Sequence, residues 1–200
     1  MQTTRGIVLR VIRHSDSRII VSLFTEHYGM LSAGVRLTRG GRTGGRSALW
    51  QMLNVVEMSV DYRPASELQK ISDVSISTPW MDLPYSPVKA SISMFLGEFL
   101  FRSLRGEGEN RPLFSFLYNS LRWLDEAEGN VANFHVLLMI RMTRFLGIWP
   151  GMAGYGRNMV YDMKNACFSA SIPVHGQYLE PQDAMWIPLL LEMDYSRMHR

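Results

Sequence analysis

The segment Ile7-Val8-Leu9-Arg10-Val11-Ile12 begins the pattern that decides the fold. Its residues alternate between two faces, and the β-branched run Ile19-Ile20-Val21 follows after a short polar break. Alternation with a period of two and enrichment in β-branched residues both indicate strands. Further strand-like segments follow at residues 30–35, 52–62 and 68–76. Residues 1–78 are therefore predicted to form five short strands.

Five short strands in a segment of this size fit an OB-type β-barrel, with an SH3-like barrel as the alternative. OB-type barrels bind single-stranded nucleic acid across one face and its bordering loops. The expected fold class is α+β, because residues 79–200 carry a different pattern.

Residues 79–200 are predicted to form a helical domain. A turn-rich connector runs from Pro79 to Pro87, where Ser86 has the character of an N-cap and Pro87 suits the first helical turn. Apolar residues then recur at helical spacing in three segments, of which the third is expected to be capped by Asn130. The three predicted helices cover roughly residues 87–104, 112–127 and 130–146.

Residues 148–179 lose the helical period and are rich in glycine, so an irregular insertion is expected there. The run Gly151-Met-Ala-Gly-Tyr-Gly156 superficially resembles a phosphate loop, but no strand precedes it and no Lys-Ser/Thr follows it. A nucleotide site is therefore discounted. Helical pattern returns from Gln182 to Leu191, with an interruption expected at Pro188.

Composition bounds the remaining possibilities. The chain has 200 residues, of which 46% are hydrophobic, which is enough for one large domain or two small ones. The single cysteine, Cys167, cannot form an internal disulfide, and no N-terminal apolar stretch has signal-peptide character. These features favour a cytoplasmic protein.

The positive charge is concentrated at the front of the chain. Residues 1–80 hold ten Lys/Arg and six Asp/Glu, a net charge of +4, while residues 81–200 hold eleven and twelve, a net charge of −1. Between His27 and Val56 there are four arginines and no acidic residue, with four glycines between the arginines. Guanidinium groups on a glycine-rich loop suit phosphates along an irregular path. A solvated hairpin loop without a partner is the alternative interpretation.

The candidate DNA-binding residues are therefore on or beside this loop. Aromatic residues near the expected binding face could stack on bases, although most of them are expected to fill the core; they are Phe24, Tyr28, Trp50 and Tyr62. The predicted DNA-binding set is Arg36, Arg39, Arg42, Arg46 and Trp50.

The order of these parts resembles the RecO family of bacterial recombination mediators over essentially the whole chain. The resemblance is carried by Gly6-Ile-Val-Leu9, by Ser15–Thr25 followed by Gly29-Met-Leu-Ser32, and by the basic loop leading to Leu49-Trp-Gln-Met-Leu53. Pro87-Val-Lys-Ala90 and Phe145-Leu-Gly147 are also similar to the family. The resemblance implies an N-terminal OB barrel, a helical domain and a zinc-binding insertion within the helical domain.

This chain departs from the family pattern in two places. Many members have four cysteines in the insertion, whereas this one has Cys167 and, eight positions later, His175. Two such ligands cannot supply tetrahedral zinc, so no metal or other cofactor is expected. The lobe is predicted to be held by packing of Tyr155, Tyr161, Phe168 and Tyr178. Family members also usually continue after the position of His199, which suggests a truncated chain.

The resemblance implies a mediator that binds single-stranded and double-stranded DNA and anneals complementary strands. It also implies binding of the C-terminal tail of the single-strand-binding protein, and cooperation with RecR to load RecA. A tail-binding groove needs apolar surface beside cations, and the candidates are Arg122 with Trp123, and Arg141 with Arg144. Such a protein is expected to be nucleoid-associated and to have no membrane partner.

Catalysis is not expected. The five histidines have no metal-ligand spacing, and the basic front part lacks the clustered acids that a metal-dependent nuclease uses. A protein-interaction adaptor, whose barrel binds an acidic partner without significant DNA binding, is the alternative to a DNA-binding mediator.

Overall fold

The computed structural model describes residues 1–37 and 48–195. The chain divides into two compact units, residues 1–129 and 130–200. The sequence placed the boundary at residue 78, at the end of the last predicted strand. In the structure, unit 1 holds the first two long helices together with the strands.

Unit 1 begins with the five strands that the sequence predicts. They are β1 (Gln2–Ser15), β2 (Arg18–Thr25), β3 (Gly29–Arg36), β4 (Val55–Asp61) and β5 (Lys70–Thr78). They form one antiparallel sheet in the order β3-β2-β1-β4-β5, which is the order of an OB-type fold. An isolated parallel bridge between Ala33 and Gln69 joins the two edges, so the barrel is partly open.

The sheet is buried on both faces along part of β1, which explains the unbroken apolar run there. Val8 belongs to the barrel core together with Val21, Leu23 and Met58. Its neighbours Ile7 and Leu9 are also fully buried and, by the alternation of a strand, lie on the opposite face. The helix α2 (Pro87–Ser103) packs against β1.

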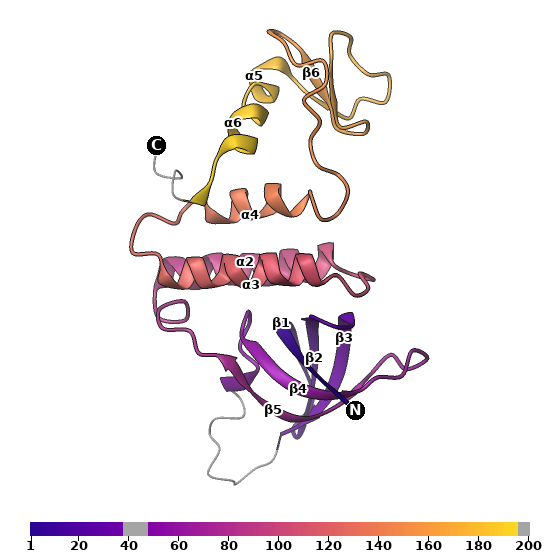
Figure 1. Ribbon diagram of the computed structural model, residues 1–200, viewed down its shortest axis with the longest axis vertical. Coiled ribbons are helices and arrows are strands. Elements are labelled where there is room, and N and C mark those ends of the chain that lie inside the picture. The colour runs from indigo at the N-terminus through magenta and orange to yellow at the C-terminus, as the bar shows by residue number, and fades with distance from the viewer. Residues whose placement is uncertain (38–47, 196–200) are drawn as a thin grey trace. The chain divides into compact units, whose positions relative to one another are not determined.

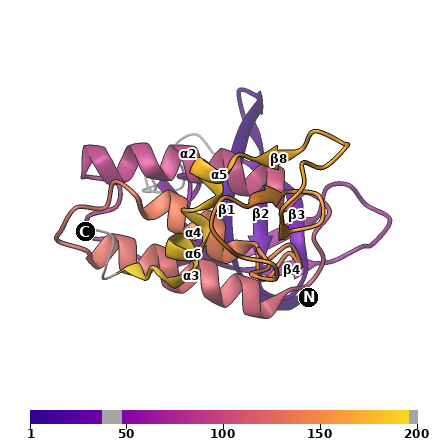
Figure 2. The ribbon, with the colours of Figure 1, turned by 90° about the horizontal axis from the view of Figure 1, so that it is seen from above.

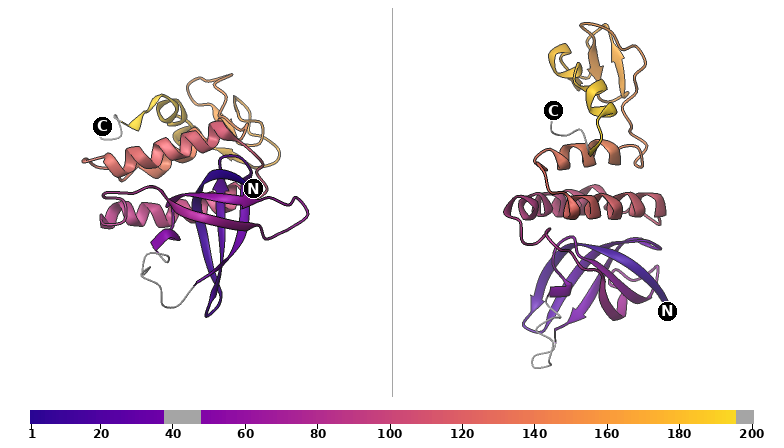
Figure 3. Two further views of the ribbon diagram at one scale, coloured as in Figure 1. Left: turned by 60° about the horizontal axis from the view of Figure 1, so that its bottom comes forward. Right: turned by 60° about the vertical axis from the view of Figure 1, so that its left-hand side comes forward.

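Two helices form a layer over the strands (Figures 1 and 3), and seen from above they run along opposite sides of that layer (Figure 2). Ser86 caps α2 and Pro87 opens it, as predicted. The second helix, α3 (Arg111–Glu126), is capped by Asn110. Arg5 of β1 links the strands to α3, since its guanidinium binds Glu26 and lies 5.4 Å from the ring centre of Phe114.

The connector between β5 and α2 is fixed by a buried polar cluster around Asp125. One carboxylate oxygen accepts the N–H of Met81 at 2.9 Å, and the other accepts those of Asp82 and Leu83 at 2.9 and 2.6 Å. The ammonium of Lys89, which is only 4% exposed, donates to the carbonyl of Asp125 and pairs with Asp82. Burial alone would raise the pKa of Asp125, but these N–H groups and Lys89 hold it below its ordinary value.

Unit 2 contains α4 (Phe134–Met142), a small three-stranded sheet, and the short helices α5 (Pro181–Ala184) and α6 (Ile187–Glu192). The predicted cap at Asn130 was wrong. Asn130 accepts the N–H of Ala132 in a turn, and the helix begins only at Phe134. The helical pattern after Gln182 is interrupted as predicted, but the break lies just before α6, with Pro188 in its first turn.

The insertion is more regular than its sequence indicates, because it contains β6 (Val160–Asp162), β7 (Cys167–Ser169) and β8 (Tyr178–Leu179). The predicted aromatic packing is confirmed for three of its four residues. Tyr155 and Tyr161 each meet Phe168 edge-on with ring centres 5.0 Å apart. Tyr178 instead donates its hydroxyl to Glu180 at the surface. Within residues 1–37 and 48–195, none of the helices is both long and apolar enough to cross a membrane.

Candidate nucleic-acid interface

A groove of about 630 Å³ crosses the outer face of β1, β2 and β3. Its floor is made of side chains that alternate with those of the barrel core on these strands, namely Arg10, Ile12, Ile20, Ser22, Met30 and Ser32. This is the face that OB-type folds use to bind nucleic acid. We call it the strand groove.

One wall of the strand groove comes from outside the barrel. Phe101 lies near the end of α2, and Arg105 and Gly106 begin the turn between α2 and α3. The turn is held on the barrel because the N–H of Met30 donates to the carbonyl of Glu107 at 2.9 Å. Gly29 makes this contact possible, since a Cβ atom there would lie 2.1 Å from the carbonyl oxygen of Gly108.

The other wall is the β4–β5 loop, which contributes Tyr62, Pro64, Ser66, Glu67 and Gln69. Gln69 is 6% exposed and its side chain closes the loop on itself. Its amide oxygen accepts the N–H of Arg63, and its amide nitrogen donates to the carbonyls of Arg63 and Ser66. These hydrogen bonds hold the loop in place, so this wall of the groove is preorganised.

Two arginines face this groove. Arg10 is exposed, and its guanidinium lies 4.8 Å from the ring centre of Phe101, which fixes its direction. Arg105, also exposed, comes from the opposite wall. Against these two cations the groove has one acidic residue, Glu67, so its lining carries a net positive charge.

A second pair of arginines lies at the ends of β2 and β3. Arg18 and Arg36 are directly opposite each other in the β2–β3 register, and both are exposed. Like charges in facing positions of a sheet repel each other. A phosphate between the two guanidinium groups would replace that repulsion with two attractive contacts, which makes the pair a suitable phosphate clamp.

The predicted DNA-binding residues have different outcomes. Arg36 lies at the exposed end of β3 as part of the pair just described. Arg39, Arg42 and Arg46 lie outside the described residues. Trp50 is 6% exposed and belongs to the barrel core, so its ring offers little exposed surface on which a base could stack. A large apolar side chain at this position fills the end of the barrel.

The other aromatic candidates divide between core and surface. Phe24 is fully buried, and Tyr28 is partly buried. Tyr62 is 45% exposed and faces the strand groove. Only Tyr62 of the four combines an exposed ring with a place in the groove.

The candidates for a partner-peptide site come from both units. Arg122 lies near the end of α3, exposed and paired with Glu126, and Trp123 follows it. In unit 2, Arg141 donates to the carbonyl of Met193 at 2.7 Å and lies over the ring of Tyr195. Arg144 lies over the ring of Trp149, with 5.0 Å to the ring centre. Arg141 therefore binds residues 193 and 195 of its own unit. Arg144 and Trp149, in contrast, offer a cation beside an aromatic ring at the surface.

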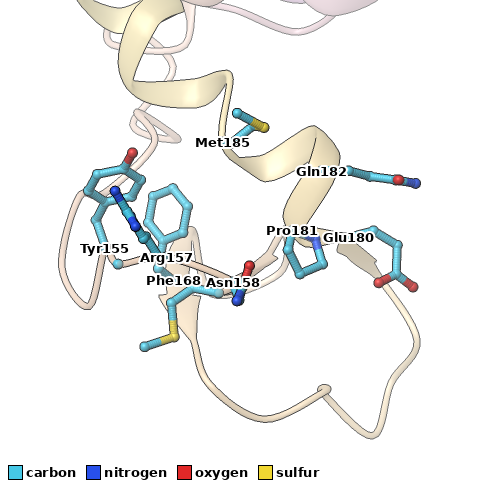
Figure 4. Close-up of a pocket in the computed structure, with 10 residues that line it drawn as sticks. Tyr155, Arg157, Asn158, Phe168, Glu180, Pro181, Gln182 and Met185 are labelled. Carbon is cyan, nitrogen blue, oxygen red and sulfur yellow. The ribbon is translucent and has the colours of Figure 1, made fainter.

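Unit 2 has a hollow of its own, of about 850 Å³, between the segment 155–159 and α5. Figure 4 shows Tyr155, Arg157 and Phe168 together on one side, and Pro181 and Met185 on the helical segment. Phe168 also belongs to the hydrophobic core of unit 2. One side of the hollow is therefore formed by the same aromatic cluster that holds the insertion together.

The two residues considered as metal ligands lie around Asp162. Cys167 is opposite Asp162 in the β6–β7 register, and His175 Nε2 lies 3.2 Å from an Asp162 carboxylate oxygen. Asp162 accepts the backbone N–H groups of Asn165 and Lys164, and these bonds, with those from the Asn165 and His175 side chains, lower its pKa to about 2. Asp162 thus closes the β6–β7 turn through hydrogen bonds.

Comparison with known proteins identifies the family. A family model described as Recombination protein O N terminal matches residues 1–80, and one described as Recombination protein O C terminal matches residues 84–159. The chain belongs to the RecO family. A DNA repair protein RecO from Phocaeicola vulgatus is 42% identical over 199 residues, which cover 100% of this chain and 83% of the relative.

Two further relatives are similar along almost the whole chain. The DNA repair protein RecO of Bacteroides fragilis is 39% identical over 200 residues, covering 100% of this chain and 83% of the relative. The one from Porphyromonas gingivalis is 28% identical over 200 residues, covering 98% and 81%. The RecO-family assignment predicted from the order of motifs is confirmed, and with it a general role in DNA repair and recombination.

Sequence reasoning missed Arg10, Arg18 and Arg105 as candidates. Arg10 and Arg18 belong to strands whose alternation was recognised, so their outward direction could have been predicted from the pattern. Arg105 follows the first helix in a Gly-rich turn, and only the fold brings it to the strand groove.

Proposed function

We propose that this RecO-family protein is a non-enzymatic recombination mediator that binds single-stranded and double-stranded DNA and promotes annealing of complementary strands. In this role it helps RecR to load RecA onto DNA coated with single-strand-binding protein. The observation that supports this proposal most directly is the strand groove, an OB-type binding face whose lining is cationic.

Electrostatics supports binding without sequence preference. Arg10 and Arg105 line the groove, and Arg18 and Arg36 lie opposite each other at the ends of β2 and β3. Their guanidinium groups can bind phosphates, which are the same for every DNA sequence, so this binding does not depend on base identity. Arg39, Arg42 and Arg46, which follow Arg36 in the sequence, add three further guanidinium groups to the same part of the chain. Neutralising phosphates also lowers the repulsion between two strands, which favours annealing.

The test is fluorescence anisotropy of a labelled single-stranded oligonucleotide across a salt series. The logarithm of the affinity falls linearly with the logarithm of the salt concentration, and each lost phosphate contact makes this fall less steep by about 0.7 for single strands. The double variant Arg10→Ser/Arg105→Ser and the quadruple variant with Ser at positions 36, 39, 42 and 46 should each reduce affinity and slope together. Arg102→Ser is the matched control, because Arg102 is an exposed arginine of α2 paired with Glu98.

Unchanged affinity and slope in both variants would contradict the proposed DNA-binding surface. The same assay distinguishes the alternative, a protein-interaction adaptor. An adaptor would bind a short acidic peptide but would show little affinity for DNA even at low salt. If DNA binding holds, stopped-flow annealing of complementary oligonucleotides coated with single-strand-binding protein tests the mediator role, with and without RecR.

For the acidic tail of the single-strand-binding protein, we propose Arg144 with Trp149 as the contact in unit 2, and Arg122 with Trp123 as the contact in unit 1. Arg144 lies against the Trp149 ring, so it combines charge with apolar surface as an acidic and apolar peptide requires. Arg144→Ala should weaken binding of a labelled tail peptide, and Arg157→Ala, an exposed arginine of the same unit, serves as the control.

A further inference from the structure

Tyr62 is the outer member of an aromatic stack. Its ring lies parallel to that of Tyr28, with centres 4.6 Å apart and planes 19° from each other. Tyr28 is the inner member, since it packs against the barrel core, while Tyr62 is 45% exposed. Because the last ring of this stack is exposed to solvent, one more flat ring can stack on it in the same parallel arrangement.

Both rings are held in place by their surroundings. The turn that carries Tyr28 is fixed by Thr25, whose hydroxyl accepts the N–H of Tyr28 and donates to the carbonyl of Gly29. The loop that begins at Tyr62 is closed by the buried side chain of Gln69. A ligand that stacks here meets a rigid surface, so little conformational entropy is lost on binding.

Tyr62 also lies where two hollows meet. It lines the strand groove together with Arg10 and Arg105. It lines a second hollow of about 400 Å³ as well, which we call the side hollow and which is formed by Gln2, His27, Tyr28, Tyr62, Gly108, Glu109 and Arg111. Tyr62 and the α2–α3 turn border both hollows, so the tyrosine stack lies between them, and we call the two hollows together the path.

We infer that Tyr62 is the base-stacking residue of this path and that it makes the path favour single-stranded over double-stranded DNA. This inference rests on the proposed DNA-binding function. A single strand can place an unpaired base on the Tyr62 ring while its phosphates follow the arginines. In a duplex the bases are stacked on one another, so the ring has no base face to contact and only the phosphate contacts remain.

The test compares a 15-nucleotide single strand with a 15-base-pair duplex in the same anisotropy assay, using the full chain. Tyr62→Ala should weaken single-strand binding by about 5- to 150-fold, the effect of removing one base–aromatic stack. Duplex affinity should change less than about two-fold, and the salt slope should stay the same, because no charge is removed. Tyr62→Phe keeps the ring and should stay within about two-fold of the parent chain.

Tyr85→Ala is the control variant, because Tyr85 is 78% exposed in the connector and lines neither hollow. A second measurement places 2-aminopurine in the single strand at saturating protein, where the protein-dependent quenching reports stacking independently of affinity. Quenching that is lost in Tyr62→Ala and retained in Tyr62→Phe supports the inference.

The outcomes separate two failures. If the parent chain binds both DNA forms but Tyr62→Ala weakens them equally, or weakens neither, the stacking role is refuted and the proposed function stands. If the parent chain binds no DNA at low salt, the proposed function fails and this inference fails with it.

Discussion

Replacement of Asp125 by alanine should destabilise unit 1 strongly, because the carboxylate is the acceptor for three backbone N–H groups. The N–H of Leu83 is the most protected, since this residue is 2% exposed, and leaving it unpaired costs about 1–3 kcal/mol. Met81 and Asp82 have exposed side chains, so water can partly replace their lost bonds, at about 0.5–1.5 kcal/mol each. The expected loss is therefore about 2–6 kcal/mol, a large part of the stability of a typical domain.

The assay is urea denaturation followed by far-ultraviolet circular dichroism, combined with hydrogen exchange of the peptide that covers residues 81–89. Asp125→Asn should lie between the parent and Asp125→Ala, because the amide keeps one oxygen acceptor but turns an N–H₂ group toward the backbone donors. Glu126→Ala is the neighbouring control. Its pair with Arg122 is exposed to solvent and contributes little, so the midpoint of this variant should hardly move.

A loss below about 1 kcal/mol in Asp125→Ala, or unchanged exchange at residues 81–83, would refute this reasoning. It would mean that solvent replaces all three bonds and that the cluster does not fix the connector.

Three further predictions concern single positions. Gly29→Ala should lower the free energy of unfolding by at least about 2 kcal/mol, because its φ of 67° is strained for alanine and the new Cβ would meet the Gly108 backbone; Gly106→Ala, at φ 82° with open space around it, should lose about 1 kcal/mol in the same urea assay. Phe168→Ala should cost unit 2 about 3 kcal/mol, measured by hydrogen exchange of residues 160–169, whereas the fully exposed Val174→Ala should cost almost nothing. The lowered pKa of Asp162 means that the unfolded chain binds the proton more tightly, so the stabilisation from Asp162 is complete above about pH 4 and is lost toward pH 2; Asp162→Asn should flatten this part of a pH series of thermal melts, and an unchanged acid limb would contradict the assignment.

A strand such as β3 was predictable because one of its faces is buried and the other is not, and burial on one face leaves alternation in the sequence. The start of β1 was not predictable in this way. Its first residues, Gln2 and Thr3, are polar and exposed, and they are strand only because β4 pairs with them. Pairing between distant segments leaves no local pattern.

The charge of the candidate surface was predictable from the sequence, but its full set of residues was not. Clustered arginines indicate a part of the chain suited to phosphates, since electrostatic contacts depend on charge density and not on exact placement. The burial of Trp50 was not predictable, because a tryptophan beside a basic loop can either stack on a base or fill a core, and the sequence does not distinguish the two. The groove itself joins Arg10 with Arg105, two residues 95 positions apart that share no sequence motif.

The turn between α2 and α3 has a practical consequence for dividing this protein into pieces. A fragment that ends near residue 80, where the first family match stops, would keep all five strands but would discard Phe101, Arg105 and the partner of Met30. Such an excised barrel would expose Ile7, Leu9 and Phe24 to water and would be a poor reagent for measuring DNA affinity. Expression of residues 1–129 keeps the barrel, its apolar cover and the complete groove in one piece.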